Sequence, residues 1–291
     1  MYVATLLTDP ARPCLDAETV AALAADWGGG PVRWLAPDEA AEVPLAAEPA
    51  DLWERWAVLQ TRGIDLAVQP AAGRRKRLLL ADMDSTMIRQ ECIDELAAVA
   101  GIGAEVAAIT ARAMNGELEF EGALRARVAL LRGLDAGVID RVMAERIRFT
   151  PGGRVLVATM RAQGAHCVLV SGGFTAFTEK VAAALGFHEH RANLLEVEGG
   201  RLAGTVAEPI LGREAKVATL EEICARLGIT SAEVLAIGDG ANDLGMLGRA
   251  GMGVALHAKP VVAAECRLRV NHGDLTAALY LQGYARAEFT S

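Results

Sequence analysis

Residues 78–86 read Leu-Leu-Leu-Ala-Asp-Met-Asp-Ser-Thr, a short apolar run that ends in two carboxylates spaced two residues apart. Two further apolar runs also end in polar residues: Val-Leu-Val-Ser-Gly-Gly at 168–173 and Val-Leu-Ala-Ile-Gly-Asp-Gly-Ala-Asn-Asp at 234–243. Helix-length segments separate these runs, which indicates right-handed crossovers between parallel strands. The sequence therefore predicts an α/β fold with a doubly wound parallel sheet. Its working residues should lie beyond the carboxyl ends of the strands.

Further strands and an insertion follow from the surrounding sequence. We predict core strands at 77–81, 166–170, 234–237 and 253–256. Roughly 70 helical residues follow the first of them, far more than a simple crossover needs, so we expect a helical cap inserted at about 90–150. Residues 194–206 alternate around a Gly-Gly pair, which is typical of a β-hairpin that protrudes from the core.

The first 72 residues predict a separate small α+β module. Strands at 2–8, 31–35, 42–46 and 64–69 with helices at 15–27 and 50–62 give the order β-α-β-β-α-β, a ferredoxin-like arrangement. The domains are then 1–72 and 73–291, joined by a linker near 70–76 whose Arg-Arg-Lys-Arg run at 74–77 should be solvated. Two roles remain open for the module: a regulatory effector site, or packing and homodimerisation without a ligand.

Composition excludes several classes of protein. The chain has 291 residues, 52% hydrophobic and 23% charged, as in globular proteins. A formal net charge of −8 argues against nucleic-acid binding. No apolar run approaches the ~18 residues of a membrane span, so we expect a soluble cytoplasmic protein. The five cysteines are scattered and suggest neither a disulfide framework nor a zinc site.

The polar signatures at the strand ends carry the chemistry. Converging parallel strands bring together four carboxylates, those of Asp82, Asp84, Asp239 and Asp243. Such carboxylates repel one another unless a cation lies among them, and hard oxygen ligands favour Mg²⁺. The Ser171 hydroxyl, the N–H groups at Gly172 and Gly173, and the Lys216 ammonium are suitable donors to a phosphoryl group. Together these groups indicate phosphoryl transfer.

Each signal is weak alone, because Asp-x-Asp and Ser-Gly-Gly occur in many ordinary turns. A dinucleotide-binding loop at 238–243 is excluded, since the segment lacks the third glycine and carries acids where pyrophosphate would bind. All four signatures together, in one order along the chain, are a specific signal for this chemistry.

With these motifs the sequence resembles the phosphatases of the haloacid dehalogenase superfamily, and among them the phosphoserine phosphatase family, over residues 76–285. The resemblance implies that Asp82 is the nucleophile and Asp84 the general acid and base. It implies that Asp82, Asp239 and the Asp84 carbonyl bind Mg²⁺, with Asp243 supporting the metal shell. Ser171, Gly172 and Lys216 would hold the phosphoryl oxygens.

Cap segments at 90–95, 114–120 and 124–128 extend the resemblance. It implies that Glu91 receives a substrate ammonium and Arg127 a carboxylate, while Met114 and Phe120 close the pocket; Asn242 is a further substrate contact. Without that context, Glu91 and Arg127 would be interpreted as exposed helix charges.

The implied function is Mg²⁺-dependent hydrolysis of O-phosphoserine to serine and phosphate through an aspartyl-phosphate, the last step of serine biosynthesis. The expected partner is thus a small molecule, not nucleic acid or membrane. One alternative is a phosphatase or phosphotransferase of the same superfamily that acts on another small phosphomonoester. The other is a signalling receiver. Asp84 argues against a receiver, because a lasting phospho-signal has no use for an acid and base placed to hydrolyse it.

Overall fold

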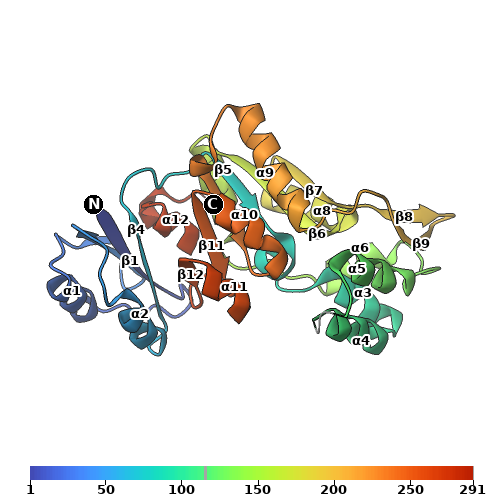
Figure 1. Cartoon of the computed structure of the whole chain (residues 1–291), viewed down its shortest axis with the longest axis horizontal. Helices are drawn as coiled ribbons and strands as arrows, with labels where there is room; N and C mark the ends of the chain where they lie inside the picture. Colours follow the sequence, from blue (N-terminus) through green and yellow to red (C-terminus); the bar gives the residue numbers. More distant parts are fainter. Residues whose placement is uncertain (115–116, 291) are drawn as a thin grey trace.

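The computed structural model describes residues 1–114 and 117–290, in which a parallel core sheet lies between an N-terminal module and a helical cap. The module lies at one end of the long axis of the molecule and the cap at the other (Figure 1). No helix in these described ranges is long and apolar enough to cross a bilayer.

The core sheet has six strands in the order β12-β11-β10-β5-β6-β7, and all neighbours are parallel. Its strands are β5 (Leu78–Ala81), β6 (His166–Phe174), β7 (Glu189–Asn193), β10 (Val234–Gly238), β11 (Met252–Leu256) and β12 (Leu268–Val270). The predicted doubly wound sheet is confirmed, and β7 and β12 are additional strands at its two edges. The three polar signatures lie at the carboxyl ends of the adjacent strands β10, β5 and β6, which places them side by side.

Helices cover both faces of this sheet. They are α7 (Gly153–Ala162), α8 (Thr175–Leu185), α9 (Arg213–Leu227), α10 (Leu244–Arg249), α11 (Pro260–Glu265) and α12 (Ala277–Leu281), with 3₁₀ turns η2 (Ser231–Glu233), η3 (Ala241–Asp243) and η4 (Arg286–Glu288). Leu79 and Ala81 pack into one apolar cluster while Leu78 and Leu80 pack into another. Alternate residues of β5 thus face opposite layers, which explains why this strand is apolar throughout.

The predicted cap insertion is present and divides into four helices. These are α3 (Cys92–Ala100), α4 (Gly103–Met114), α5 (Phe120–Ala129) and α6 (Val138–Glu145). The predicted hairpin is formed by β8 (Leu195–Glu198) and β9 (Arg201–Val206), and positive φ at Gly199 and Gly200 permits its two-residue turn. The hairpin joins the cap, because Leu202 N–H donates to the Leu134 carbonyl at 2.8 Å.

The N-terminal module has the predicted ferredoxin-like arrangement. Its elements are β1 (Tyr2–Thr8), α1 (Ala17–Asp26), β2 (Arg33–Ala36), β3 (Ala40–Leu45), α2 (Leu52–Gln60) and β4 (Ile64–Pro70). The sheet order is β2-β3-β1-β4, with every neighbour antiparallel. Helix α1 begins later than predicted, because the Asp16 carboxylate caps it by accepting from Thr19 N–H at 2.6 Å.

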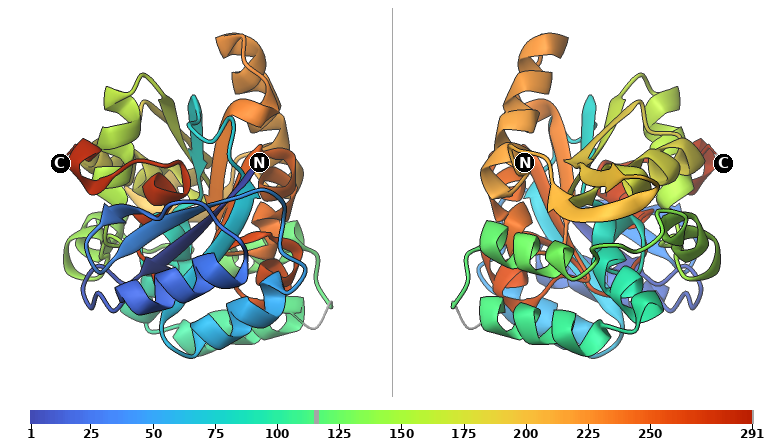
Figure 2. Two further views of the ribbon diagram at one scale, coloured as in Figure 1. Left: turned by 90° about the vertical axis from the view of Figure 1, so that its left-hand side faces the viewer. Right: turned by 90° about the vertical axis from the view of Figure 1, so that its right-hand side faces the viewer.

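The linker is solvated only in part, because Arg75 and Arg77 are exposed as the sequence predicts, whereas Arg74 is half-buried and Lys76 is buried. Its four cations all have partners, as in the Arg75–Glu288 pair at 2.6 Å. Lys76 is only 9% exposed, and its ammonium donates to the Ala232 carbonyl at 2.7 Å. In the module, β4 lies beside β12 of the core and β1 lies beside α12. The left view of Figure 2 shows the blue module in front of the core. Arg74, which contacts both Glu42 of the module and the Leu281 carbonyl, and Lys76 therefore hold the linker to its neighbours.

Candidate active site

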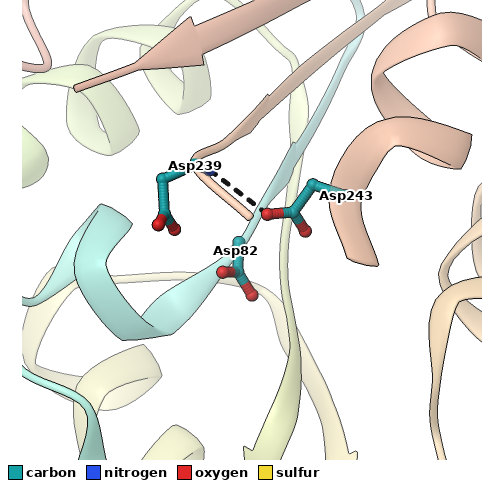
Figure 3. A group of neighbouring side chains, drawn as sticks. All are labelled: Asp82, Asp239 and Asp243. Carbon is teal, nitrogen blue, oxygen red and sulfur yellow. Dashed lines mark hydrogen bonds between the residues drawn. The ribbon is translucent and has the colours of Figure 1, made fainter. Parts of the chain in front are cut away.

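Three carboxylates meet at the carboxyl edge of the core sheet. Asp82 directly follows β5, Asp239 follows β10, and Asp243 ends η3 (Figure 3). Each offers an oxygen within 4.8 Å of the others, and all three residues are buried. The structure thus brings together three of the four carboxylates that the sequence singled out.

Lys216, on α9, lies against this group. Its ammonium donates to Asp82 Oδ1 and to Asp243 Oδ1, both at 2.6 Å, and the residue is fully buried. Burial lowers the pKa of Lys216, but the two carboxylates outweigh burial and raise it overall. The side chain therefore stays an ammonium at neutral pH.

Asp243 is held by the backbone around it. Its Oδ2 accepts from Asp239 N–H at 3.2 Å, as the dashed line in Figure 3 shows, and from Gly240 N–H at 3.0 Å. A Cβ at Gly238 would collide with the Asp243 side chain, so only glycine permits this approach. Asp243 has protein partners on both oxygens and braces the group.

The donor set fits a hard divalent cation. Burial and the neighbouring Asp243 raise the pKa of Asp82 well above its ordinary value, against the effect of Lys216. Burial also raises the pKa of Asp239 to about 6. When all three carboxylates are ionised, the group and its one ammonium carry two uncompensated negative charges. A divalent cation bound by oxygen atoms balances this charge.

Asp84 lies apart from that group, within the turn η1 (Met83–Met87). A Cβ at Gly173 would lie 3.1 Å from Asp84 Oδ2, so the carboxyl group faces the Ser-Gly-Gly segment. Burial raises the pKa of Asp84 to about 7, Glu91 adds to the shift, and hydrogen bonds from Cys92 oppose it. Asp84 Oδ1 is buried without a hydrogen-bond partner among the described residues. Such a group can both donate and accept a proton near neutral pH.

The Ser-Gly-Gly segment ends β6 next to Asp84. Ser171 is buried, and its Oγ accepts from Gly173 N–H at 2.9 Å. Asn193, at the end of β7, donates to the Gly172 carbonyl at 2.8 Å and accepts from Leu211 N–H at 2.6 Å. Asn193 thus fixes this segment against the chain that leads to α9. The sequence motifs gave no signal for it.

The cap reaches the same segment through Phe120. A Cβ at Gly172 would lie 3.2 Å from the Phe120 ring and 3.7 Å from Asn242 Nδ2. Gly212 also borders the ring. The structure therefore brings Phe120, Gly172 and Asn242 together. Met114, the other predicted pocket residue, ends α4, and its side chain lies outside the described part of the chain.

Glu91 and Arg127 are not the exposed helix charges of the alternative interpretation. Glu91 Oε1 accepts from the Ser85 hydroxyl at 2.8 Å. Arg127 is half-buried in the cap, and its Nη1 lies 3.5 Å from Thr110 Oγ1. Burial lowers the pKa of Arg127, while Asp94 and Glu91 counteract this. By contrast Arg125, on the same helix, is exposed.

Known proteins share this arrangement. A family model described as haloacid dehalogenase-like hydrolase matches residues 79–248. A protein named phosphoserine phosphatase from Streptomyces coelicolor is 48% identical over 228 residues, which are 78% of this chain. The chain spans only 55% of the length of that relative. A protein named probable phosphoserine phosphatase from Schizosaccharomyces pombe is 46% identical over 72% of this chain and 70% of its own length.

The crystal structure of a HAD family hydrolase from Salmonella enterica serovar Typhi has nearly the same architecture. It superposes with a TM-score of 0.86 and 28% identity over 97% of this chain and 98% of its own. The match therefore includes the N-terminal module. The chain belongs to the haloacid dehalogenase-like hydrolases and, within this class, to the phosphoserine phosphatase family.

Proposed function

We propose that the protein hydrolyses O-phosphoserine to serine and phosphate with Mg²⁺, the last step of serine biosynthesis. One observation carries the proposal. A buried group of carboxylates paired with Lys216 lies below a cap that contributes Glu91, Arg127 and Phe120. The group suits phosphoryl transfer, and the cap residues suit a small amino acid.

Asp82 is the proposed nucleophile. One of its oxygens attacks phosphorus, the bond from phosphorus to the serine oxygen breaks, and Asp84 donates a proton to that oxygen. Asp84 then takes a proton from the water that attacks the aspartyl-phosphate, which releases phosphate and restores Asp82. The pKa of Asp84, raised to about 7 by burial, suits both proton transfers.

The phosphoryl oxygens are held by donors of this chain. Ser171 keeps its hydroxyl hydrogen free to donate, because its Oγ accepts from Gly173 N–H. Lys216 and the N–H groups of the Ser-Gly-Gly segment supply further donors. Asp82, Asp239 and the Asp84 carbonyl would bind Mg²⁺, and Asp243 would support them. When bound, Mg²⁺ neutralises the repulsion between the Asp82 carboxylate and the substrate phosphate.

The cap residues account for the substrate. The Arg127 guanidinium suits a bidentate contact with the carboxylate of phosphoserine, and Glu91 suits its ammonium. The Phe120 ring borders Gly172 and would form an apolar wall of the pocket.

Phosphate release across matched substrates tests the proposal. Phosphoserine is compared with phosphoethanolamine, which lacks the carboxylate, and with the phosphate ester of 3-hydroxypropanoate, which lacks the ammonium. We expect the highest kcat/KM for phosphoserine. Faster turnover of another small phosphomonoester would support the alternative substrate class instead.

Arg127→Ala should raise KM for phosphoserine about tenfold or more, because the substrate carboxylate loses its charged partner. KM for phosphoethanolamine should change little. Arg125→Ala, on the same helix but paired at the surface with Glu121 and Glu208, is the matched control and should leave both values unchanged. Equal losses on both substrates for Arg127→Ala would make Arg127 structural.

A further inference from the structure

Ser85 has a backbone conformation that side chains other than glycine rarely adopt. It lies in the left-handed region, with φ 56° and ψ 3°, between Asp84 and Thr86. Such strain persists only where surrounding contacts fix it, and it is common at functional sites. Two contacts fix it here. Ser85 N–H donates to the Gln90 carbonyl at 3.2 Å, and its hydroxyl donates to Glu91 Oε1 at 2.8 Å.

Because of this kink, the side chains of the consecutive residues Asp84, Ser85 and Thr86 reach three different neighbours. Asp84 faces Gly173, whereas Thr86 donates its hydroxyl to Asp239 Oδ1 at 3.2 Å. Ser85, between them, reaches across to the cap. The catalytic turn is thereby connected both to the carboxylate group and to Glu91.

The other end of this contact is also held. The segment before Glu91 pairs with the segment that returns from the cap: Arg89 N–H donates to the Arg148 carbonyl, and Arg148 N–H to Gln90 Oε1, both at 2.9 Å. Glu91 immediately precedes α3, yet its carboxylate does not cap that helix. Its Oε1 turns to Ser85 instead, which leaves acceptor capacity on the carboxylate for another donor.

We propose that Ser85 is a positioning residue for substrate recognition, because its hydroxyl holds the Glu91 carboxylate in the orientation that receives the substrate ammonium. The inference rests on the proposed function, in which Glu91 binds that ammonium. A carboxylate that is already oriented loses less rotamer freedom when the ammonium binds. Ser85 therefore contributes to the choice of amino substrates without touching them.

The experiment measures a preference, defined as kcat/KM for phosphoserine divided by kcat/KM for the phosphate ester of 3-hydroxypropanoate. Ser85→Ala should lower this preference about tenfold, the effect of losing one hydrogen bond to a charged group, mainly through KM for phosphoserine. Ser85→Gly removes the hydroxyl but relieves the positive φ, so it should lower the preference equally. Ser85→Asn, which tolerates this conformation and keeps a donor, should restore part of it.

Two results would overturn the inference. One is an unchanged preference in both Ser85→Ala and Ser85→Gly. The other is a loss of preference in Ser85→Ala that Ser85→Gly repairs, because that result would show that backbone strain causes the loss. Glu91→Gln separates this failure from that of the proposed function. If the unsubstituted protein shows no preference for phosphoserine, the proposed function fails. If it shows one that Glu91→Gln abolishes and Ser85→Ala retains, only the role of Ser85 fails.

Discussion

Burial sets the protonation of single residues in this site. Asp84 and Asp239 have pKa values raised by burial to about 7 and about 6. A carboxyl group with a raised pKa binds its proton more tightly in the folded chain than in the unfolded chain. Its contribution to stability is therefore fully present below the unfolded pKa, near 3.8, and is lost as the pH rises through the folded value.

Metal-free protein should consequently lose thermal stability between pH 4 and pH 7. Mg²⁺ should raise Tm more at pH 7 than at pH 5, because it binds the ionised carboxylates. Asp239→Asn is the comparison variant. Its Tm should fall less steeply with rising pH, and most of the increase in Tm caused by Mg²⁺ should be lost. A rise in Tm with Mg²⁺ as large in Asp239→Asn as in the unsubstituted protein would contradict this metal site.

At the scale of elements, the site depends on how strand ends and loops are fixed to one another. β6 and β7 are neighbours, and Asn193 at the end of β7 bonds both to the Ser-Gly-Gly segment and to the chain before α9. Without Asn193 the Leu211 N–H and the Gly172 carbonyl lose partners in a half-buried position.

Asn193→Ala should therefore lower the free energy of unfolding by about 2 kcal/mol, because partners are left unsatisfied. It should also lower kcat/KM, because Gly172 and Ser171 are no longer held. Asn193→Asp keeps the acceptor for Leu211 N–H. Its free energy of unfolding and its kcat/KM should therefore lie between those of the unsubstituted protein and those of Asn193→Ala. Denaturant unfolding measures the difference, and no loss in Asn193→Ala would show that Asn193 does not brace the segment.

The sequence predicts the elements that carry strong local signals. β5, β6 and β10 are found because strands buried on both faces are continuous apolar runs. β7 reads Glu-His-Arg-Ala-Asn and β12 has three residues, so these edge strands carry no such run. Likewise the motifs predict Asp82, Asp239 and Lys216. The contacts of Asn193 and of Ser85 with Glu91 depend on where loops meet in space, which no local pattern encodes.

At the scale of the whole molecule, the module and the core share buried contacts. Asp65 on β4 is fully buried, and its carboxylate accepts from the backbone N–H groups of Asn271, His272 and Gly273, each at 2.9 Å. Leu7 and Tyr280 belong to the same apolar cluster. The residues of the proposed chemistry all lie within 73–291, and that region packs against the module. The boundary at residue 72, a homodimer and an effector site remain predictions.

Asp65→Ala should lower the free energy of unfolding by about 3 kcal/mol, because three backbone donors lose a charged acceptor. KM for phosphoserine should not change, since β4, which carries Asp65, lies in the module at the opposite end of the molecule from the cap (Figure 1). Asp26→Ala is the control, because its pair with Arg55 is exposed and should contribute little. Equal stability of both variants would show that the module is not fixed to the core through Asp65.

If Asp82 is the nucleophile, the phosphoryl group is transferred to residue 82 during turnover, and the identity of the phosphorylated residue can be measured. Protein quenched during turnover of phosphoserine with Mg²⁺ is treated with borohydride, which reduces an aspartyl-phosphate to homoserine, and its peptides are sequenced by mass spectrometry. We expect homoserine at position 82, and only when substrate is present. Homoserine at another aspartate, or turnover that leaves residue 82 unmodified at every quench time, would contradict it.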